Sequence, residues 1–191
     1  MRTLAILAVL LVLPAGAQQP FELDPSFRTA INRSNVNSIW VQPDGRVIAS
    51  GRMRYDGQTT DKLLLRLLPD GQLDPTYAAS GLGGGEIKEH AGAIYVGNQY
   101  AVRRILPDGQ NDPSFLLGTA PVPYFGAAAM GDFLFHEEGM ILSGQHLLED
   151  TVRGFTGLHA FIWFNLDGTL DTTRIHHQAN GTIREREWLP D

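Results

Sequence analysis

The fold is decided by a stretch that reads Leu67-Leu68-Pro69-Asp70-Gly71-Gln72 and continues directly as Leu73-Asp74-Pro75-Thr76-Tyr77. In its first half Pro presets φ, Asp bonds to its own backbone and Gly takes positive φ, which is the chemistry of a tight turn. Apolar residues flank this turn, so the stretch predicts a β-hairpin in which Lys62 to Leu68 pairs with Gln72 to Asp74.

Both halves of this stretch recur in the same order along the chain. The Asp-Pro half is present at Asp24, Asp74 and Asp112, and a decayed Leu-Asp-Thr-Thr copy contains Asp171, which gives spacings of 50, 38 and 59 residues. The turn half recurs at 105–110 as Ile-Leu-Pro-Asp-Gly-Gln and at 165–169 as Asn-Leu-Asp-Gly-Thr. Such self-similarity at long period is typical of repeat architectures.

A second hairpin phrase lies in the middle of each repeat. It reads Ile-Trp-Val-Gln-Pro-Asp-Gly-Arg-Val-Ile over 39–48, and it is echoed at 134–144 and, more weakly, at 90–97. Ser38 to Val41 and Arg46 to Ser50 are its predicted paired strands. The phrases together divide the chain into repeats at approximately 23–72, 73–110 and 111–169, with a partial repeat at 170–191.

Two hairpins per repeat predict about four short strands, and no pattern after residue 17 supports a helix. The chain is therefore expected to be all-β. Four-stranded units of this length suit the blades of a β-propeller, with a β-solenoid-like array as the alternative. Three units are fewer than the four to eight blades that close a propeller. Because 188–191 reads like the start of another turn, we expect an incomplete propeller, completed by further blades of the same polypeptide or by self-association.

The three phrases together resemble those of the delta-60 repeat family. The resemblance is carried by Leu-Asp-Pro-Ser-Phe at 23–27, by Val-Gln-Pro-Asp-Gly-Arg-Val-Ile at 41–48 and by Leu-Pro-Asp-Gly at 68–71, and it covers about 21–171. The second repeat is shortened, and the third has Glu-Glu-Gly and Leu-Asp-Gly in place of Pro-Asp-Gly. The resemblance implies an exported bacterial protein with propeller-like blades, and it implies no defined catalytic residues.

The first 17 residues have the pattern of a secretory signal peptide. Arg2 precedes an apolar run over 4–13, and Ala15-Gly16-Ala17 supplies the small residues of a cleavage site. The mature chain is expected to begin near Gln18 and to be secreted to the periplasm, the medium or the cell surface, with no integral membrane segment. Cleavage would remove one Arg and no acid, so the net charge would move from −6 to −7. An acidic chain without basic clusters is a poor binder of nucleic acid.

The residues that could carry chemistry form no catalytic or metal-binding pattern in the sequence. The Asp pairs at 70/74, 108/112 and 167/171 are explained by turn formation, and the EF-hand spacing for calcium is absent. The adjacent His176 and His177 would face opposite sides of a strand, and His136 lies at a predicted hairpin tip. The chain has no Cys and no Gly-x-Ser-x-Gly motif. We therefore predict no catalytic residues, no metal site and no cofactor.

Aromatic residues give the better indication of binding. Phe27, Tyr77 and Phe115 are equivalent by repeat and are predicted to lie in the core. Tyr55 and Phe155 fall in the long variable connections, where exposed rings would contact sugars or a protein partner, and they are the candidate ligand-binding residues. The sequence thus favours a non-catalytic secreted or cell-surface scaffold that binds a protein or a surface polysaccharide. The alternative is a propeller-based carbohydrate-active hydrolase or lyase, which two convergent carboxylates on one rim would favour.

Overall fold

The computed structural model describes residues 25–79, 81, 83–98, 101–117, 126–137, 139–151 and 154–176. These residues form strands, turns and loops without a helix, in three antiparallel sheets. Sheet A contains β1 (Ile31–Val41), β2 (Val47–Tyr55) and β3 (Lys62–Leu67). Sheet B contains β4 (Ile87–His90), β5 (Ala93–Gly97) and β6 (Val102–Ile105). Sheet C contains β7 (Gly126–His136), β8 (Gly139–Asp150) and β9 (Phe155–Asn165).

The all-β prediction is confirmed, and each sheet lies within one of the predicted repeats. The predicted fourth strand, however, is reduced in each repeat to one isolated bridge, and the three bridges are Leu67–Leu73, Ile105–Asn111 and Phe164–Leu170. The pairing ends there because the next residue is the Asp that begins a new turn. Its carboxylate accepts a hydrogen bond from the backbone two residues later, as Asp74 does from the Thr76 N–H at 2.9 Å.

The Asp-Gly turns have the geometry that the sequence predicts. In the turn after β3 the Asp70 carboxylate accepts a hydrogen bond from the Gln72 N–H at 3.0 Å, and Gly71 has φ of 85°. A Cβ on Gly71 would lie 2.9 Å from the Arg28 backbone, so Gly is required by the close approach as well as by the positive φ.

That close approach recurs in each repeat, because the segment after each Asp-Pro phrase crosses to the next turn. The N–H groups of Arg28, Ala78 and Leu116 donate to the carbonyls of Asp70, Asp108 and Asp167 at 2.9, 2.7 and 2.8 Å. The start of each repeat is therefore tied by its backbone to the Asp-Gly turn at the end of the same repeat.

The strand registers make residues of the three sheets equivalent. Arg66 pairs with Ile48, Arg104 with Tyr95 and Trp163 with Ile141, each five residues before its turn Gly. Following the same registers to the first strand of each sheet makes Ile39, Ile87 and Phe133 equivalent. These equivalences allow the two contacts between sheets to be compared position by position.

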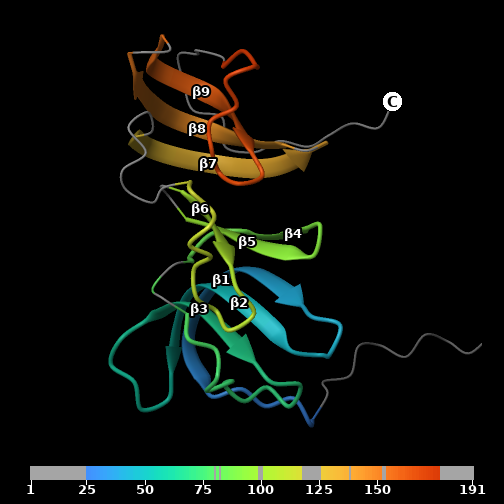
Figure 1. Ribbon diagram of the computed structural model, residues 1–191. Coiled ribbons are helices and arrows are strands. Elements are labelled where there is room, and N and C mark those ends of the chain that lie inside the picture. The colour runs from blue at the N-terminus through green and yellow to red at the C-terminus, as the bar shows by residue number, and fades with distance from the viewer. Residues whose placement is uncertain are drawn as a thin grey trace, which may run out of the picture.

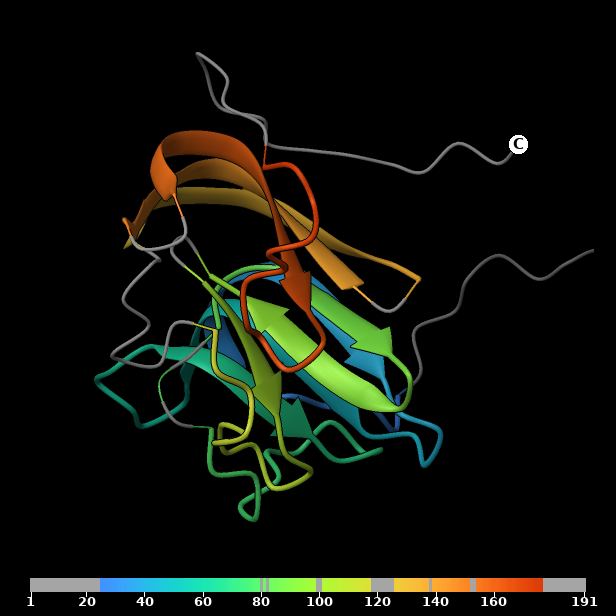
Figure 2. The same cartoon turned by 45° about the horizontal axis from the view of Figure 1, so that its top comes forward.

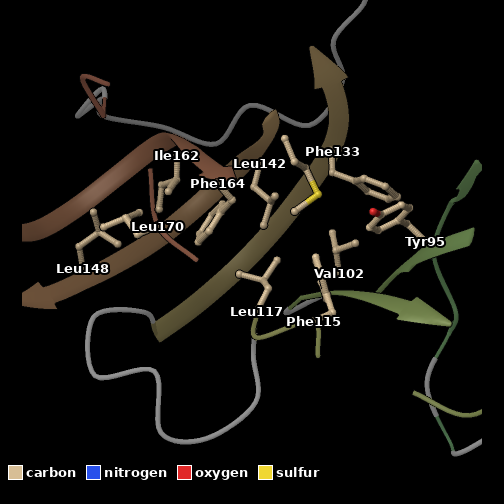
Figure 3. Close-up of a cluster of buried hydrophobic side chains, with 11 residues drawn as sticks. Tyr95, Val102, Phe115, Leu117, Phe133, Leu142, Leu148, Ile162, Phe164 and Leu170 are labelled. Carbon is tan, nitrogen blue, oxygen red and sulfur yellow. The ribbon is translucent and has the colours of Figure 1, made fainter. Parts of the chain in front are cut away.

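Sheet B lies between sheets A and C (Figures 1 and 2). The contact between sheets A and B, here the A–B junction, buries the apolar residues Ile48, Leu64, Tyr77, Ile87, Val96 and Ile105. The contact between sheets B and C, here the B–C junction, joins Tyr95, Val102, Phe115 and Leu117 to the inner residues of sheet C (Figure 3). Successive sheets therefore pack face to face, as blades do.

The prediction that Phe27 lies in the core is wrong, whereas it is confirmed for the equivalent Tyr77 and Phe115. The Phe27 side chain is 39% exposed and Phe115 only 1% exposed, because no described residues form a sheet on the outer side of sheet A. The predicted signal peptide at 1–17 and most of the partial repeat, from 177 to 191, lie outside the described residues. The part of the chain that is described contains no apolar helix long enough to span a membrane.

Candidate functional site

The A–B junction is built around a buried ion pair that joins the end of one repeat to the start of the next. Arg66 on β3 donates from Nε to the Asp74 carboxylate at 2.8 Å and from Nη1 to the Pro107 carbonyl at 2.7 Å. Its guanidinium also lies over the Tyr77 ring, 4.5 Å from the centroid. The Arg66 and Asp74 side chains are only 5% and 3% exposed, so this pair is shielded from solvent.

The B–C junction repeats this arrangement with a more exposed pair. Arg104 on β6 donates from Nε to Asp112 at 2.7 Å and from Nη1 to the Leu166 carbonyl at 3.2 Å. Its guanidinium lies 5.4 Å from the centroid of the Phe115 ring. In both junctions the arginine links its own sheet to the backbone of the next repeat's turn.

The third repeat exchanges the positions of the cation and the aromatic ring. Trp163 occupies the position of Arg66, and Arg174 the position of Tyr77. Arg174 lies 4.2 Å from the centroid of the Trp163 ring and 3.2 Å from the Asp171 carboxylate. The contact is retained although both residues have changed, which indicates that it is structural.

The aspartates of these units are held in the ionised form. Hydrogen bonds from Thr76, and next from Arg66, lower the pKa of Asp74. Hydrogen bonds from Ser114, and next from Arg104, lower the pKa of Asp112. For Asp171, burial opposes the shift, but the hydrogen bonds from Thr173 leave its pKa lowered. Groups of this kind stabilise turns and do not exchange protons near neutral pH.

A cavity of about 630 Å³ opens into the A–B junction. Sheet A contributes Trp40, Gln42 and Ile48 to its wall, and sheet B contributes Glu89 and Ile94. Further lining residues are Arg66, Tyr77, Arg104, Ile105 and Asp112. This volume is within the range of small-molecule sites. A second cavity, of about 770 Å³, is lined by Arg52, Arg54 and Asp61, whose ion pairs at 2.6 Å lower the pKa of Asp61.

A second group of titratable side chains lies where sheets B and C meet. Lys88 Nζ lies 3.2 Å from both the Glu86 and Asp132 carboxylates and donates to the Phe133 carbonyl at 2.5 Å. Burial and the hydrogen bond with Asp132 raise the pKa of Glu86 to about 7. Sequence analysis missed this cluster, because Glu86 and Asp132 are brought together only by the packing of two sheets.

The spacing of these carboxyl groups does not fit glycoside hydrolysis. Retaining and inverting glycosidases hold their two carboxyl groups about 5–5.5 Å and 6.5–9.5 Å apart. Glu86 and Asp132 hydrogen-bond to each other and are bridged by Lys88, so no sugar fits between them. Neither residue lines either of the two cavities above. Two carboxylates do converge, contrary to expectation, but in the geometry of a link between sheets.

The structure places the two candidate binding aromatics in packed surroundings rather than on exposed connections. Tyr55 ends β2, packs against the apolar cluster of sheet A, and its hydroxyl accepts a hydrogen bond from the Leu73 N–H at 2.8 Å. Phe155 begins β9 and packs edge-on against His176, with centroids 5.1 Å apart. The two rings belong to different sheets and do not line one site, and their role in ligand binding stays a prediction.

The histidines singled out in the sequence also lie among packing contacts. His136 packs against Trp163 with centroids 6.1 Å apart, and His176 is buried, with its Nδ1 accepting from the Trp163 N–H at 3.2 Å. His177 and Glu138 lie outside the described residues. Within the described ranges no three His, Asp or Glu side chains are grouped so that they could hold a metal ion.

Comparison with known proteins agrees with this architecture. A family model described as a domain of unknown function, DUF5122, with a β-propeller fold matches residues 42–77. The match spans β2, β3 and the repeat phrase through Tyr77, and therefore includes Ile48 and Leu64, the buried residues that sheet A contributes to the A–B junction. No curated protein and no solved structure matches the chain. Its three sheets are β-propeller-type blades, and the match supports a β-propeller-like repeat family.

Proposed function

We propose that this chain is a non-catalytic, exported repeat scaffold of the delta-60 type that acts by binding and assembly. The observation that carries the proposal is the exposed apolar strip of β1 on the outer face of sheet A. Ile39 is 61% exposed on this face, whereas the equivalent Ile87 and Phe133 are 7% and 0% exposed, since each packs on the preceding sheet. A face that the same repeat buries twice elsewhere is suited to packing against another blade.

The chemistry of this face agrees with such an occupant. Val41, next but one to Ile39 on β1, is also exposed, and Ala49, Leu65 and Leu67 lie buried on the same face of sheet A, on β2 and β3. The exposed side chains are apolar and lie two residues apart on one face of a strand, so a second apolar sheet complements them better than a charged polymer does. In the isolated chain the available partner is a second copy. Export is supported by the leader-like pattern at 1–17.

The test is the association state of the purified mature chain. We expect sedimentation analysis to show concentration-dependent association, and the double variant Ile39→Asp with Val41→Asp to remove it. Thr59→Asp, at an exposed position in the connection between β2 and β3, is the matched control and should leave association unchanged. A wild-type chain that stays monomeric at high concentration, or a double variant that associates equally well, would contradict the proposal.

The alternative, a carbohydrate-active hydrolase or lyase, makes a different prediction. Its only acid–base candidate among the described residues is the Glu86–Asp132 pair, because burial raises the pKa of Glu86 to about 7. Release of reducing or unsaturated ends from a polysaccharide, lost in Asp132→Asn, would support the enzyme against the scaffold.

A further inference from the structure

The cavity of the A–B junction occupies the place that Phe135 fills at the B–C junction. Phe135 stacks on His90, with centroids 4.4 Å apart, and packs on Tyr95 at 4.6 Å. By strand register the A–B equivalents of Phe135, His90 and Tyr95 are Glu89, Gln42 and Ile48, and all three line the cavity. The cavity therefore exists because Glu89 replaces the large ring of Phe135 at the equivalent position of a repeated contact between sheets.

Two residues that line the cavity each have a buried polar atom without a hydrogen-bond partner among the described residues. These atoms are the hydroxyl of Tyr77 and the side-chain amide oxygen of Gln42. The Tyr77 side chain is 9% exposed, and burial raises its pKa to about 12, so at neutral pH the hydroxyl is protonated and able to donate. The equivalent Phe115 has no hydroxyl, so packing of the repeat does not require one. Buried polar atoms without partners are rare and indicate an absent water or ligand.

Both cations of the cavity wall are already neutralised. Arg66 pairs with Asp74 and Arg104 with Asp112. The further carboxylate of the wall, Glu89, accepts a hydrogen bond from the Gly92 N–H at 2.6 Å. Such a wall offers no unmatched positive charge for an acidic ligand. Its remaining surface is largely apolar, with the indole of Trp40 contributing an aromatic wall.

We propose that the A–B cavity binds a pyranose ring of a neutral oligosaccharide. Sugar hydroxyls both donate and accept hydrogen bonds, which matches the Tyr77 donor and the Gln42 acceptor, and sugar C–H faces pack on aromatic rings such as Trp40. The proposal rests on the binding function proposed above and specifies the ligand class at one site. The outer face of sheet A and the A–B cavity are separate surfaces, so the two proposals can fail independently.

The test uses the purified full mature chain against an array of neutral hexose oligosaccharides, followed by titration calorimetry with the best ligand. Tyr77→Phe, which copies Phe115, should weaken binding about tenfold, since one hydrogen bond to the ligand is lost. Glu89→Phe with Ile94→Met, which copies Phe135 and Met140 of the B–C junction, should abolish binding by filling the cavity. Thr59→Ala, in the second cavity, should bind as the wild type does.

Thermal unfolding of each variant shows whether the fold is retained, and Tyr77→Phe is the variant least expected to disturb it. Absence of binding by any neutral sugar, with the cavity holding water only, would overturn the ligand assignment while leaving the assembly proposal intact. Equal affinity in the filled variant would place the sugar elsewhere and would also overturn the assignment. Binding restricted to acidic sugars would contradict the argument from charge.

Discussion

The A–B and B–C junctions are made from the same repeat, yet one is hollow and the other is filled. At the B–C junction Phe133 and Phe135 occupy the positions that Ile87 and Glu89 hold at the A–B junction. The A–B junction in turn has the more deeply buried ion pair, with Arg66 5% exposed against 21% for Arg104. The repeat conserves the arrangement of the backbone and the ion pair, and the sizes of a few side chains decide whether a junction is a core or a cavity.

The largest expected effect is a difference between the two junctions in the free energy of unfolding that is lost when a buried apolar side chain is truncated. Phe133→Ala should lower the free energy of unfolding by about 3–5 kcal/mol, because it removes a fully buried ring from a filled core. The equivalent Ile87→Ala should cost about 2 kcal/mol, because a smaller side chain is removed from a cluster in which Ile48 already borders the A–B cavity. Urea denaturation of both variants measures the difference. A cost at Ile87 equal to that at Phe133 would show that the A–B junction is packed as tightly as the other.

The ion pairs should rank in the opposite order. Arg66→Leu leaves the buried Asp74 with only the more distant Arg46, at 3.8 Å, and should cost about 3 kcal/mol. Arg104→Leu should cost about 1 kcal/mol, because the more exposed Asp112 is partly solvated once its partner is lost. The same denaturation experiment compares them, and the order would be wrong if Arg104→Leu were the more damaging change. Because both aspartates have lowered pKa values, either contribution is present above about pH 4 and is lost as the pH falls below it.

The smallest effect concerns Glu86, which lies with Lys88 and Asp132 where sheets B and C meet. The raised pKa of Glu86, about 7, means that the folded chain binds more protons than the unfolded chain between about pH 4.3 and 7. Stability from this group is therefore present at low pH and lost as the pH rises through 7. Glu86→Gln should remove this dependence and stabilise the chain at pH 8 by about 1 kcal/mol, a value reduced for solvent screening because Glu86 is 49% exposed.

Melting temperatures of the wild type and of Glu86→Gln at pH 5 and pH 8 test this prediction. Lys88 and Asp132 are the charged groups that face Glu86, so Asp132→Asn is the matched variant and should also reduce the dependence. A wild-type chain that is equally stable at both pH values would contradict the raised pKa.

Much of the fold could be predicted from local chemistry. The Asp-Gly turns at 70–71, 108–109 and 167–168 are specified by residues that interact within two positions, so their hairpins were recognisable without an alignment. The fourth strand was predicted too long because the Asx turn at Asp74 competes with strand pairing and ends it. The burial of Phe27 was wrongly predicted for a different reason, since equivalence in sequence does not supply the neighbouring sheet.

The candidate site shows where prediction from sequence ends. Tyr55 and Phe155 were selected because they fall in variable connections, but the first meets the Leu73 backbone and the second meets His176 across the fold. The cavity residues Gln42, Tyr77 and Glu89 carry no local pattern that marks a site. Their role depends on which side chain the adjacent sheet places opposite them.

The sequence by itself therefore determined the repeat, the turns, the all-β class and the absence of a run of basic residues, because each depends on neighbours in the chain. Only the tertiary structure decided that one junction is hollow, that Glu86 meets Asp132, and that Ile39 and Val41 on the outer face of sheet A are exposed. Those properties depend on the packing of sheets whose contacting residues are tens of positions apart. Packing depends on whether the side chains that meet across two sheets match in volume and charge, and no short stretch of the chain specifies which side chains meet.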